Sequence, residues 1–151
     1  MVKEISIDII WGILNTIPDP EIPSISIVDL GIIRDIQFAE DTFRITITPT
    51  YSGCPAMSFI TEEINRQLES QGIRNFQLET MLSPPWTTDW MNNEVKTKLN
   101  KAGIAPPSEH VVCPQCDSDK VEVISNFGST ACKALYKCLS CNEPFHHFKQ
   151  F

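Results

Sequence analysis

Six cysteines give this chain its clearest chemical pattern, because four of them form two Cys-x-x-Cys pairs. Cys113 and Cys116 make the first pair and Cys138 and Cys141 the second, with 21 residues between the pairs. Cysteines at this spacing are typical of ribbons in which two knuckles bring four thiolates to the corners of a tetrahedron. The sequence therefore predicts one structural zinc ion bound by these four residues.

The segment around these pairs supports a metal site. It has few large apolar side chains, so a bound ion must replace the core that so short a segment cannot build. Strand-like residues at 120–124 and 134–137 lie between the pairs, as expected when two hairpin knuckles meet. Iron in an electron-transfer centre is the alternative, since four thiolates suit both metals and spacing does not choose between them.

Three further residues of the ribbon segment could bind metal or react. Cys132 lies outside both pairs, and we expect a small, half-buried residue there, with a functional thiol as the alternative. His146 and His147 are predicted to be surface or packing residues, because four cysteines already complete a structural zinc site.

The N-terminal part of the chain contains a second candidate site. Asp19 and Glu21 lie in an acidic loop with three prolines, and Cys54 lies at the predicted start of a helix. Backbone amides and the positive end of the helix dipole stabilise a thiolate there, so we expect a reactive thiol. The alternative is that Cys54 only fits a tight turn.

Hydrophobic periodicity predicts the elements that position these residues. Apolar residues four apart favour a helix over 5–17, which the prolines end, and alternation predicts a hairpin of two strands at 32–38 and 43–50. A helix over 56–72, a strand over 76–82 and a helix over 91–102 follow. The predicted fold class is α+β, with a sheet of three or slightly more strands packed by helices, followed by a β zinc ribbon.

Glycine and proline at 103–109 are typical of a linker, and the cysteines begin directly after it. We therefore expect two domains, an α/β domain over residues 1–105 and a zinc ribbon over residues 106–151.

Charge and hydropathy exclude several classes of function. The net charge is −7, and residues 1–105 hold 8 basic and 14 acidic side chains against 4 and 5 in residues 106–151. Neither part is basic, so nucleic-acid binding would lack phosphate neutralisation, and no nucleic-acid partner is expected. No apolar run approaches the ~20 residues of a membrane span, and no signal peptide is evident, so we expect a cytoplasmic protein with no membrane partner.

Three short motifs carry a resemblance to a known family. The segments at 19–23, 27–32 and 53–55 together resemble the metal-sulfur cluster biosynthesis domain family, whose members assist iron-sulfur assembly. The resemblance implies that Asp19 and Cys54 form a functional pair, and Glu21 and Asp29 match the same pattern. It also implies that these residues contact iron or an iron-sulfur cluster transiently.

Longer blocks at 48–56, 84–90 and 127–138 extend the resemblance over nearly the whole chain, to the PaaD family. Members of that family are encoded with phenylacetyl-CoA epoxidase, a di-iron monooxygenase with an iron-sulfur reductase. The resemblance implies a non-catalytic accessory protein of phenylacetate catabolism, with the epoxidase subunits, above all the reductase, as partners. Relatives commonly end in a further cysteine, whereas this sequence ends in Phe151, and Cys132 falls in a shared block.

Other functions stay open at this point. A structural adapter of the oxygenase would use both domains as binding surfaces, with Trp86 and Trp90 either exposed anchors or packed residues. A rubredoxin-like electron carrier would require iron in the ribbon. A thiol enzyme based on Cys54 needs a general base, yet all three histidines lie in or beside the ribbon.

Overall fold

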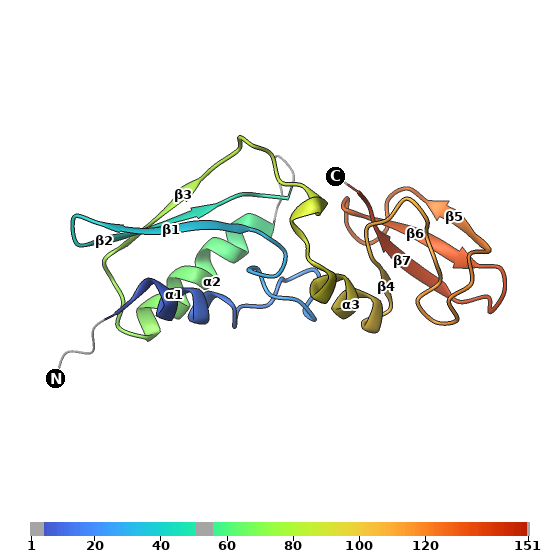
Figure 1. Cartoon of the computed structure of the whole chain (residues 1–151), viewed down its shortest axis with the longest axis horizontal. Coiled ribbons are helices and arrows are strands. Elements are labelled where there is room, and N and C mark those ends of the chain that lie inside the picture. Colours follow the sequence, from blue (N-terminus) through green and yellow to red (C-terminus); the bar gives the residue numbers. More distant parts are fainter. Residues whose placement is uncertain (1–4, 51–55, 151) are drawn as a thin grey trace. The chain divides into compact units, whose positions relative to one another are not determined.

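The computed structural model describes residues 5–50 and 56–150. Its backbone contacts divide the chain into two compact units, Met1–Trp86 and Thr87–Phe151, and each unit contains one sheet. Helices pack beside the first sheet and the second carries the cysteine pairs, so the predicted α+β class is confirmed. Figure 1 shows the elements of both units.

The N-terminal unit is a three-stranded sheet with two helices on one face (Figure 1). Its elements are α1 (Ile7–Leu14), β1 (Ile33–Ala39), β2 (Thr42–Ile47), α2 (Ala56–Ser70) and β3 (Phe76–Thr80). The strand order is β1-β2-β3, with β1 antiparallel to β2 and β2 parallel to β3. A parallel pair needs a crossover, and α2 supplies it.

The hairpin of β1 and β2 forms where alternation predicted it. Phe38 pairs with Phe43 and Ala39 with Thr42, so two residues make the turn. Glu40 and Asp41 both have positive φ, at 53° and 58°, which matches the right-handed twist of the strands. The hairpin prediction is confirmed.

Isoleucine and leucine fill the space between the sheet and the helices. The fully buried members include Ile10, Leu14, Ile45, Ile47, Ile60, Ile64 and Leu68. The opposite face of the sheet is polar, and there the exposed Arg44 and Glu79 approach to 3.9 Å. Burial on one face fixes the register of the strands, because a slip of one residue would expose the whole apolar set.

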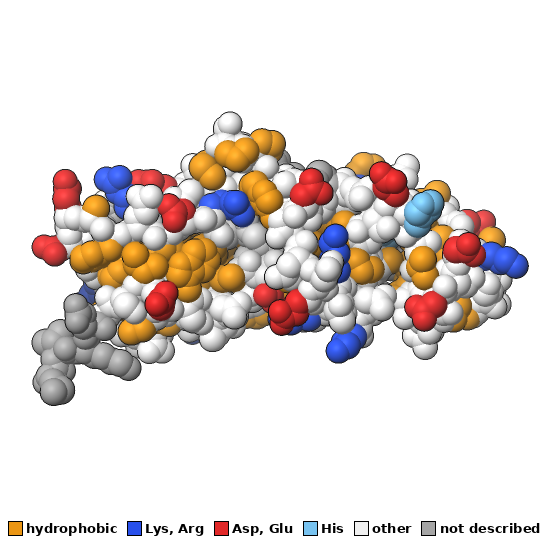
Figure 2. Space-filling view, viewed as in Figure 1, with side chains coloured by type: hydrophobic (Ala, Val, Ile, Leu, Met, Phe, Trp, Pro, Cys, Tyr) orange, Lys and Arg blue, Asp and Glu red, His pale blue; other side chains and the backbone are white. Residues whose placement is uncertain are grey.

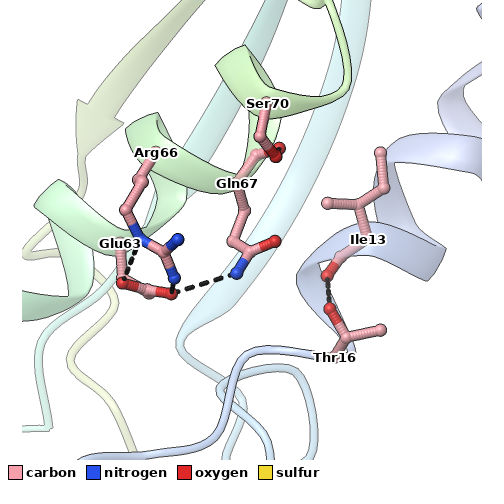
Figure 3. A network of polar contacts seen from close by, with 6 residues as sticks. All are labelled: Ile13, Thr16, Glu63, Arg66, Gln67 and Ser70. Atoms are coloured by element: carbon pink, nitrogen blue, oxygen red, sulfur yellow. Dashed lines mark hydrogen bonds and ion pairs between the residues drawn. The ribbon is translucent and has the colours of Figure 1, made fainter.

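The outer side of α2 carries a small polar network (Figure 3). Glu63 accepts hydrogen bonds from Arg66 and from Gln67, whose Nε2 lies 3.1 Å away. These bonds, first that of Arg66, lower the pKa of Glu63. The group stabilises the helix surface, as side chains three and four residues apart do in helices.

The C-terminal unit begins with a short 3-10 helix, η1 (Thr88–Trp90), and α3 (Asn93–Lys101), followed by a four-stranded sheet. The strands are β4 (Ile104–Ala105), β5 (Val121–Ser125), β6 (Lys133–Cys138) and β7 (Pro144–Phe148), in the order β4-β7-β6-β5. Residues 104 and 105, expected in a linker, pair in parallel with His146 and His147. The structure differs from that prediction because two paired residues leave no periodicity in a sequence.

No helix among the described residues is long and apolar enough to cross a bilayer. Apolar side chains do reach the surface, some of them on the face visible in Figure 2. In the ribbon unit the most exposed large ones are Phe127, Ile124, Leu139 and Val123, at 69, 53, 53 and 51%.

Candidate metal centre and proline loop

The structure brings the four cysteines of the two pairs together. All four sulfur atoms lie within 4.8 Å of one another. The Sγ atoms of Cys113 and Cys141 are 3.8 Å apart, and those of Cys116 and Cys138 are 3.6 Å apart. Sulfurs this close without disulfide bonds are arranged as the ligands of a single ion.

Both knuckles use the same backbone design. The residue after each pair, Asp117 or Asn142, has positive φ, at 61° and 64°, which turns the chain back sharply. Cys113 N then donates to Ser118 O and Cys138 N to Glu143 O, each at 2.9 Å. Aspartate and asparagine tolerate this left-handed conformation better than most residues, which explains their presence at these positions.

Backbone amides point at the sulfur atoms. Gln115 N donates to Cys113 Sγ, and Ser140 N and Cys141 N donate to Cys138 Sγ, all at 3.4 Å. The amide of Cys141, followed by that of Ser140, lowers the pKa of Cys138 to about 6. A thiolate therefore forms readily there at neutral pH, as metal binding requires.

The other sulfurs resist deprotonation while no cation is present. The amide of Ser118 favours the thiolate of Cys116, but the adjacent Cys138 sulfur, burial and the remaining cysteines raise its pKa to about 12. The pKa of Cys141 is raised as well: the Glu143 amide favours its thiolate, but burial and the Cys138 and Cys113 sulfurs outweigh it. Four thiolates cannot coexist at this spacing without a positive ion, so the donor set fits Zn²⁺.

The apolar core beside the metal site is small. Ala105, Cys113, Cys138 and Phe145 form its buried centre, with Val111, Val121 and Tyr136 packed against it. Tyr136 and Phe145 stack with ring centroids 5.8 Å apart. Since two of the four central residues are ligands, zinc supplies a cross-link that this core cannot replace.

The proline loop is organised by Asp19. Its side chain is 4% exposed, and its Oδ1 accepts hydrogen bonds from Glu21 N and Ile22 N, both at 2.9 Å. Asp19 N donates to Ile25 O at 2.9 Å and closes the loop. One carboxylate oxygen thus fixes the conformation of the loop, while Glu21 is half-buried beside it.

Asp29 stabilises the end of the same loop. Its Oδ2 accepts from Ser26 N at 3.2 Å, and its own amide donates to Ser26 Oγ at 3.0 Å. The Ser26 hydroxyl donates to Asn15 Oδ1 at 2.8 Å, which links the loop to the end of α1. In the structure Asp29 therefore has a positioning role.

Cys54 lies outside the described residues, so its predicted contact with Asp19 stays a prediction. The strand that leads toward it ends at Thr48, whose amide donates to Ile32 O at 2.8 Å. Thr48 is 1% exposed, and its hydroxyl has no hydrogen-bond partner. Sequence reasoning missed this residue because threonine in a strand is ordinarily a packing residue.

Trp86 belongs to the scaffold of the N-terminal unit. It is 5% exposed, and its indole N–H donates to Leu30 O at 2.8 Å. The hydrogen bond ties the segment after β3 to the end of the proline loop. Of the two alternatives for this tryptophan, packing is the one observed, and Trp90 is half-buried.

The remaining ribbon candidates pack against the sheet. Cys132 is 3% exposed, and its sulfur lies 3.1 Å from Thr130 Oγ1. His147 is buried, meets Tyr136 edge to face at 5.5 Å and leaves its Nδ1 without a hydrogen-bond partner. His146 is half-buried. None of the three belongs to the four-sulfur cluster.

Two family comparisons match different parts of the chain. The iron-sulfur cluster assembly protein family matches residues 2–72, and the PaaD zinc beta ribbon domain matches residues 99–149. An Escherichia coli protein that is named as a subunit of a "Putative 1,2-phenylacetyl-CoA epoxidase" is 45% identical over 149 residues, which cover 93% of this chain and 90% of that protein. The chain belongs to the PaaD family. The PaaD resemblance and the zinc ribbon expected from the motifs are thereby confirmed.

Relatives of this PaaD-family chain also include shorter proteins. The Fe-S protein maturation auxiliary factor of Porphyromonas gingivalis is 35% identical over 88 residues, covering 57% of this chain and 83% of that protein. A domain of unknown function from Bacillus anthracis superposes with a TM-score of 0.56 at 26% identity, covering 61% of this chain and 89% of that one. The PaaD family thus joins an iron-sulfur-assembly-type domain to a zinc ribbon.

Proposed function

We propose that this chain is a non-catalytic accessory protein of phenylacetyl-CoA epoxidase that assists assembly of its iron-sulfur cluster or another metallocentre, with the iron-sulfur reductase as main client. One observation carries the proposal: a single chain joins a match to iron-sulfur assembly proteins and a PaaD zinc ribbon. The full-length likeness to the Escherichia coli protein supplies the client, and the auxiliary-factor relatives supply the activity.

In this proposal Cys54, Asp19 and Glu21 make a transient contact with iron or a cluster. Two backbone amides hold the Asp19 carboxylate in one orientation, so no side-chain entropy is lost when it meets a cation. One thiolate and one carboxylate leave coordination positions for the ligands of the client, which suits transfer better than storage.

The ribbon serves as a docking module in the same proposal. Zinc has no redox chemistry, so a zinc-loaded ribbon does not carry electrons, and the rubredoxin-like alternative loses its basis. The chain is proposed to work in the cytoplasm, where reduced thiols and nascent clusters are available.

Co-expression with the epoxidase subunits tests the proposal. We expect loss of this chain, or Cys54→Ser in it, to lower iron and acid-labile sulfide per reductase. Asp19→Asn is the sharper variant, because the amide oxygen still accepts from Glu21 N and Ile22 N while the charge disappears. Asp19→Ala serves as comparison, since it removes the loop contacts as well.

The result also decides for or against a structural adapter, a role that the name of the Escherichia coli relative favours because it describes a component of the epoxidase. Full cluster content with Cys54→Ser and Asp19→Asn, together with loss of activity on deletion, would establish the adapter. Unchanged cluster content and activity after deletion would exclude both functions.

A further inference from the structure

The face of the ribbon sheet that points away from the zinc core carries a buried lysine. Tyr136 pairs with Phe145 on the core face, so the alternation of β6 and β7 places Lys133, Leu135 and His146 on the other face. Lys133 is 5% exposed, although lysine is almost never buried without a partner. The ribbon therefore holds a cation in an unusual setting.

Among the described residues, the ammonium group of Lys133 has no hydrogen bond and no ion pair. The buried side-chain atoms without a partner there are only Thr48 Oγ1 and His147 Nδ1, so solvent reaches the nitrogen of Lys133. Glu122, an acidic residue of the same face, lies opposite Lys137, roughly 13 Å along the strand from Lys133. The stem is buried, and the charged end opens outward without a carboxylate.

The neighbours of Lys133 form a second set of polar groups. Gly128 N donates to Lys133 O at 2.7 Å, and a Cβ on Gly128 would lie 2.6 Å from Cδ2 and 3.0 Å from Nε2 of His146. The imidazole thus rests directly on the glycine. Burial and the charge of Lys133 lower the pKa of His146, so a neutral ring with one N–H faces this region at neutral pH.

An exposed aromatic ring beside this group is held rigidly. Phe127 is 69% exposed, and Lys149 Nζ lies 4.5 Å from its ring centroid. Lys149 is anchored twice, by Nζ to Asn126 O at 2.9 Å and by its amide to Cys132 O at 3.0 Å. An exposed aromatic fixed in this way loses little entropy on contact with a partner, as interface anchors do.

We propose that Ile124, Phe127, Lys133, His146 and Lys149 form a docking surface for a partner protein, which inserts a carboxylate flanked by apolar side chains. The argument for this occupant is charge complementarity. Two cations without an acidic partner among the described residues lie in a chain of net charge −7, beside two exposed apolar side chains. A single carboxylate matches the single charge of Lys133, and Phe127 and Ile124 receive its apolar neighbours. The surface is independent of the chemistry proposed for Cys54.

The test uses the zinc-loaded full chain and two synthetic peptides, acetyl-Ser-Leu-Glu-Leu-Ser-amide and its glutamine counterpart. Amide NMR shifts of Gly128 and Lys133 report binding. We expect saturable shifts with the glutamate peptide and affinity lower by about 10- to 100-fold for the glutamine peptide, the range of one charge-assisted hydrogen bond. Lys133→Met should produce the same loss, because methionine keeps the buried stem.

Lys137→Met is the matched control, since Lys137 lies on the same strand and face opposite Glu122. It should leave binding unchanged, whereas Phe127→Ala should weaken it. Equal binding of the two peptides, equal effects of Lys133→Met and Lys137→Met, or shifts that never saturate would overturn the proposal. Saturation by acetate at the same concentration as the glutamate peptide would also overturn it, because the site would then bind small acids and not a protein.

Discussion

Replacing Gly128 by alanine should destabilise the ribbon through one identifiable clash. The new Cβ would lie 2.6 Å from His146 Cδ2, 3.0 Å from His146 Nε2 and 3.2 Å from Lys133 O. Ordinary carbon contacts are about 3.5–4.0 Å, so the imidazole must move by about 1 Å or the loop must shift. Overpacking of this kind costs about 1–3 kcal/mol, and that is the expected loss in the free energy of unfolding.

A double-mutant cycle isolates this clash. His146→Ala removes the ring that the new methyl group meets, so Gly128→Ala should cost less than about 0.5 kcal/mol in that background. Chemical denaturation of the zinc-loaded protein, followed by amide NMR of ribbon residues, measures all four variants. Gly12→Ala is the control, because nothing lies within 4 Å of its Cβ position in α1, and alanine should stabilise that helix by about 0.5–1 kcal/mol.

Two results would refute this reasoning. Gly128→Ala with wild-type stability would mean that the imidazole is not held against the glycine. The same loss in the His146→Ala background would place the clash at the Lys133 carbonyl, and the close packing of glycine and imidazole would not explain why glycine occupies this position.

Three further predictions concern the metal, the scaffold and pH. Cys138→Ser should remove the bound zinc and the tertiary structure of the ribbon, whereas Cys132→Ser should keep both; elemental analysis and amide NMR decide, and a folded, zinc-loaded Cys138→Ser protein would contradict the ligand set. Trp86→Phe leaves the buried Leu30 carbonyl without its donor and should lower the stability of the N-terminal unit by about 1–3 kcal/mol, measured by urea unfolding against Trp11→Phe, and equal effects of both would argue against the hydrogen bond. Burial lowers the pKa of His147, an effect that contact with the Ala105 backbone partly offsets; the unfolded chain therefore takes up the proton first, and stability present above about pH 6.5 falls as the pH drops through the folded-state value. His147→Phe should lose less ribbon stability than the wild type between about pH 7 and about pH 5 in excess zinc, and identical pH profiles would exclude His147 as the cause.

Residue patterns predicted most of the elements because their signals are local. The hairpin, the helix after Cys54 and strands β5 and β6 follow from alternation, helical spacing and turn residues, and the structure places them as expected. The third strand was predicted by alternation, but its parallel pairing with β2 was not, since direction depends on the crossover.

The sequence failed where contacts are distant or very short. Strand β4 has two residues and exists only through its pairing with His146 and His147, so the sequence there resembled a linker. Strand β7 was not predicted either, because no alternation marks its five residues. Cysteine pairs at ligand spacing predicted the four-sulfur cluster, whereas the burial of Lys133 and the glycine beneath His146 depend on the folded sheet.

The two knuckles share the burial of the metal site unequally. Each contributes one buried sulfur, Cys113 or Cys138, and one exposed sulfur, Cys116 or Cys141. A chelator or an oxidant such as hydrogen peroxide can reach only the outer pair, so we expect zinc to leave stepwise, with Cys116 and Cys141 detaching first. The inner pair then retains the ion long enough for the outer thiols to rebind, and the rate of zinc loss depends on how long the outer side stays open.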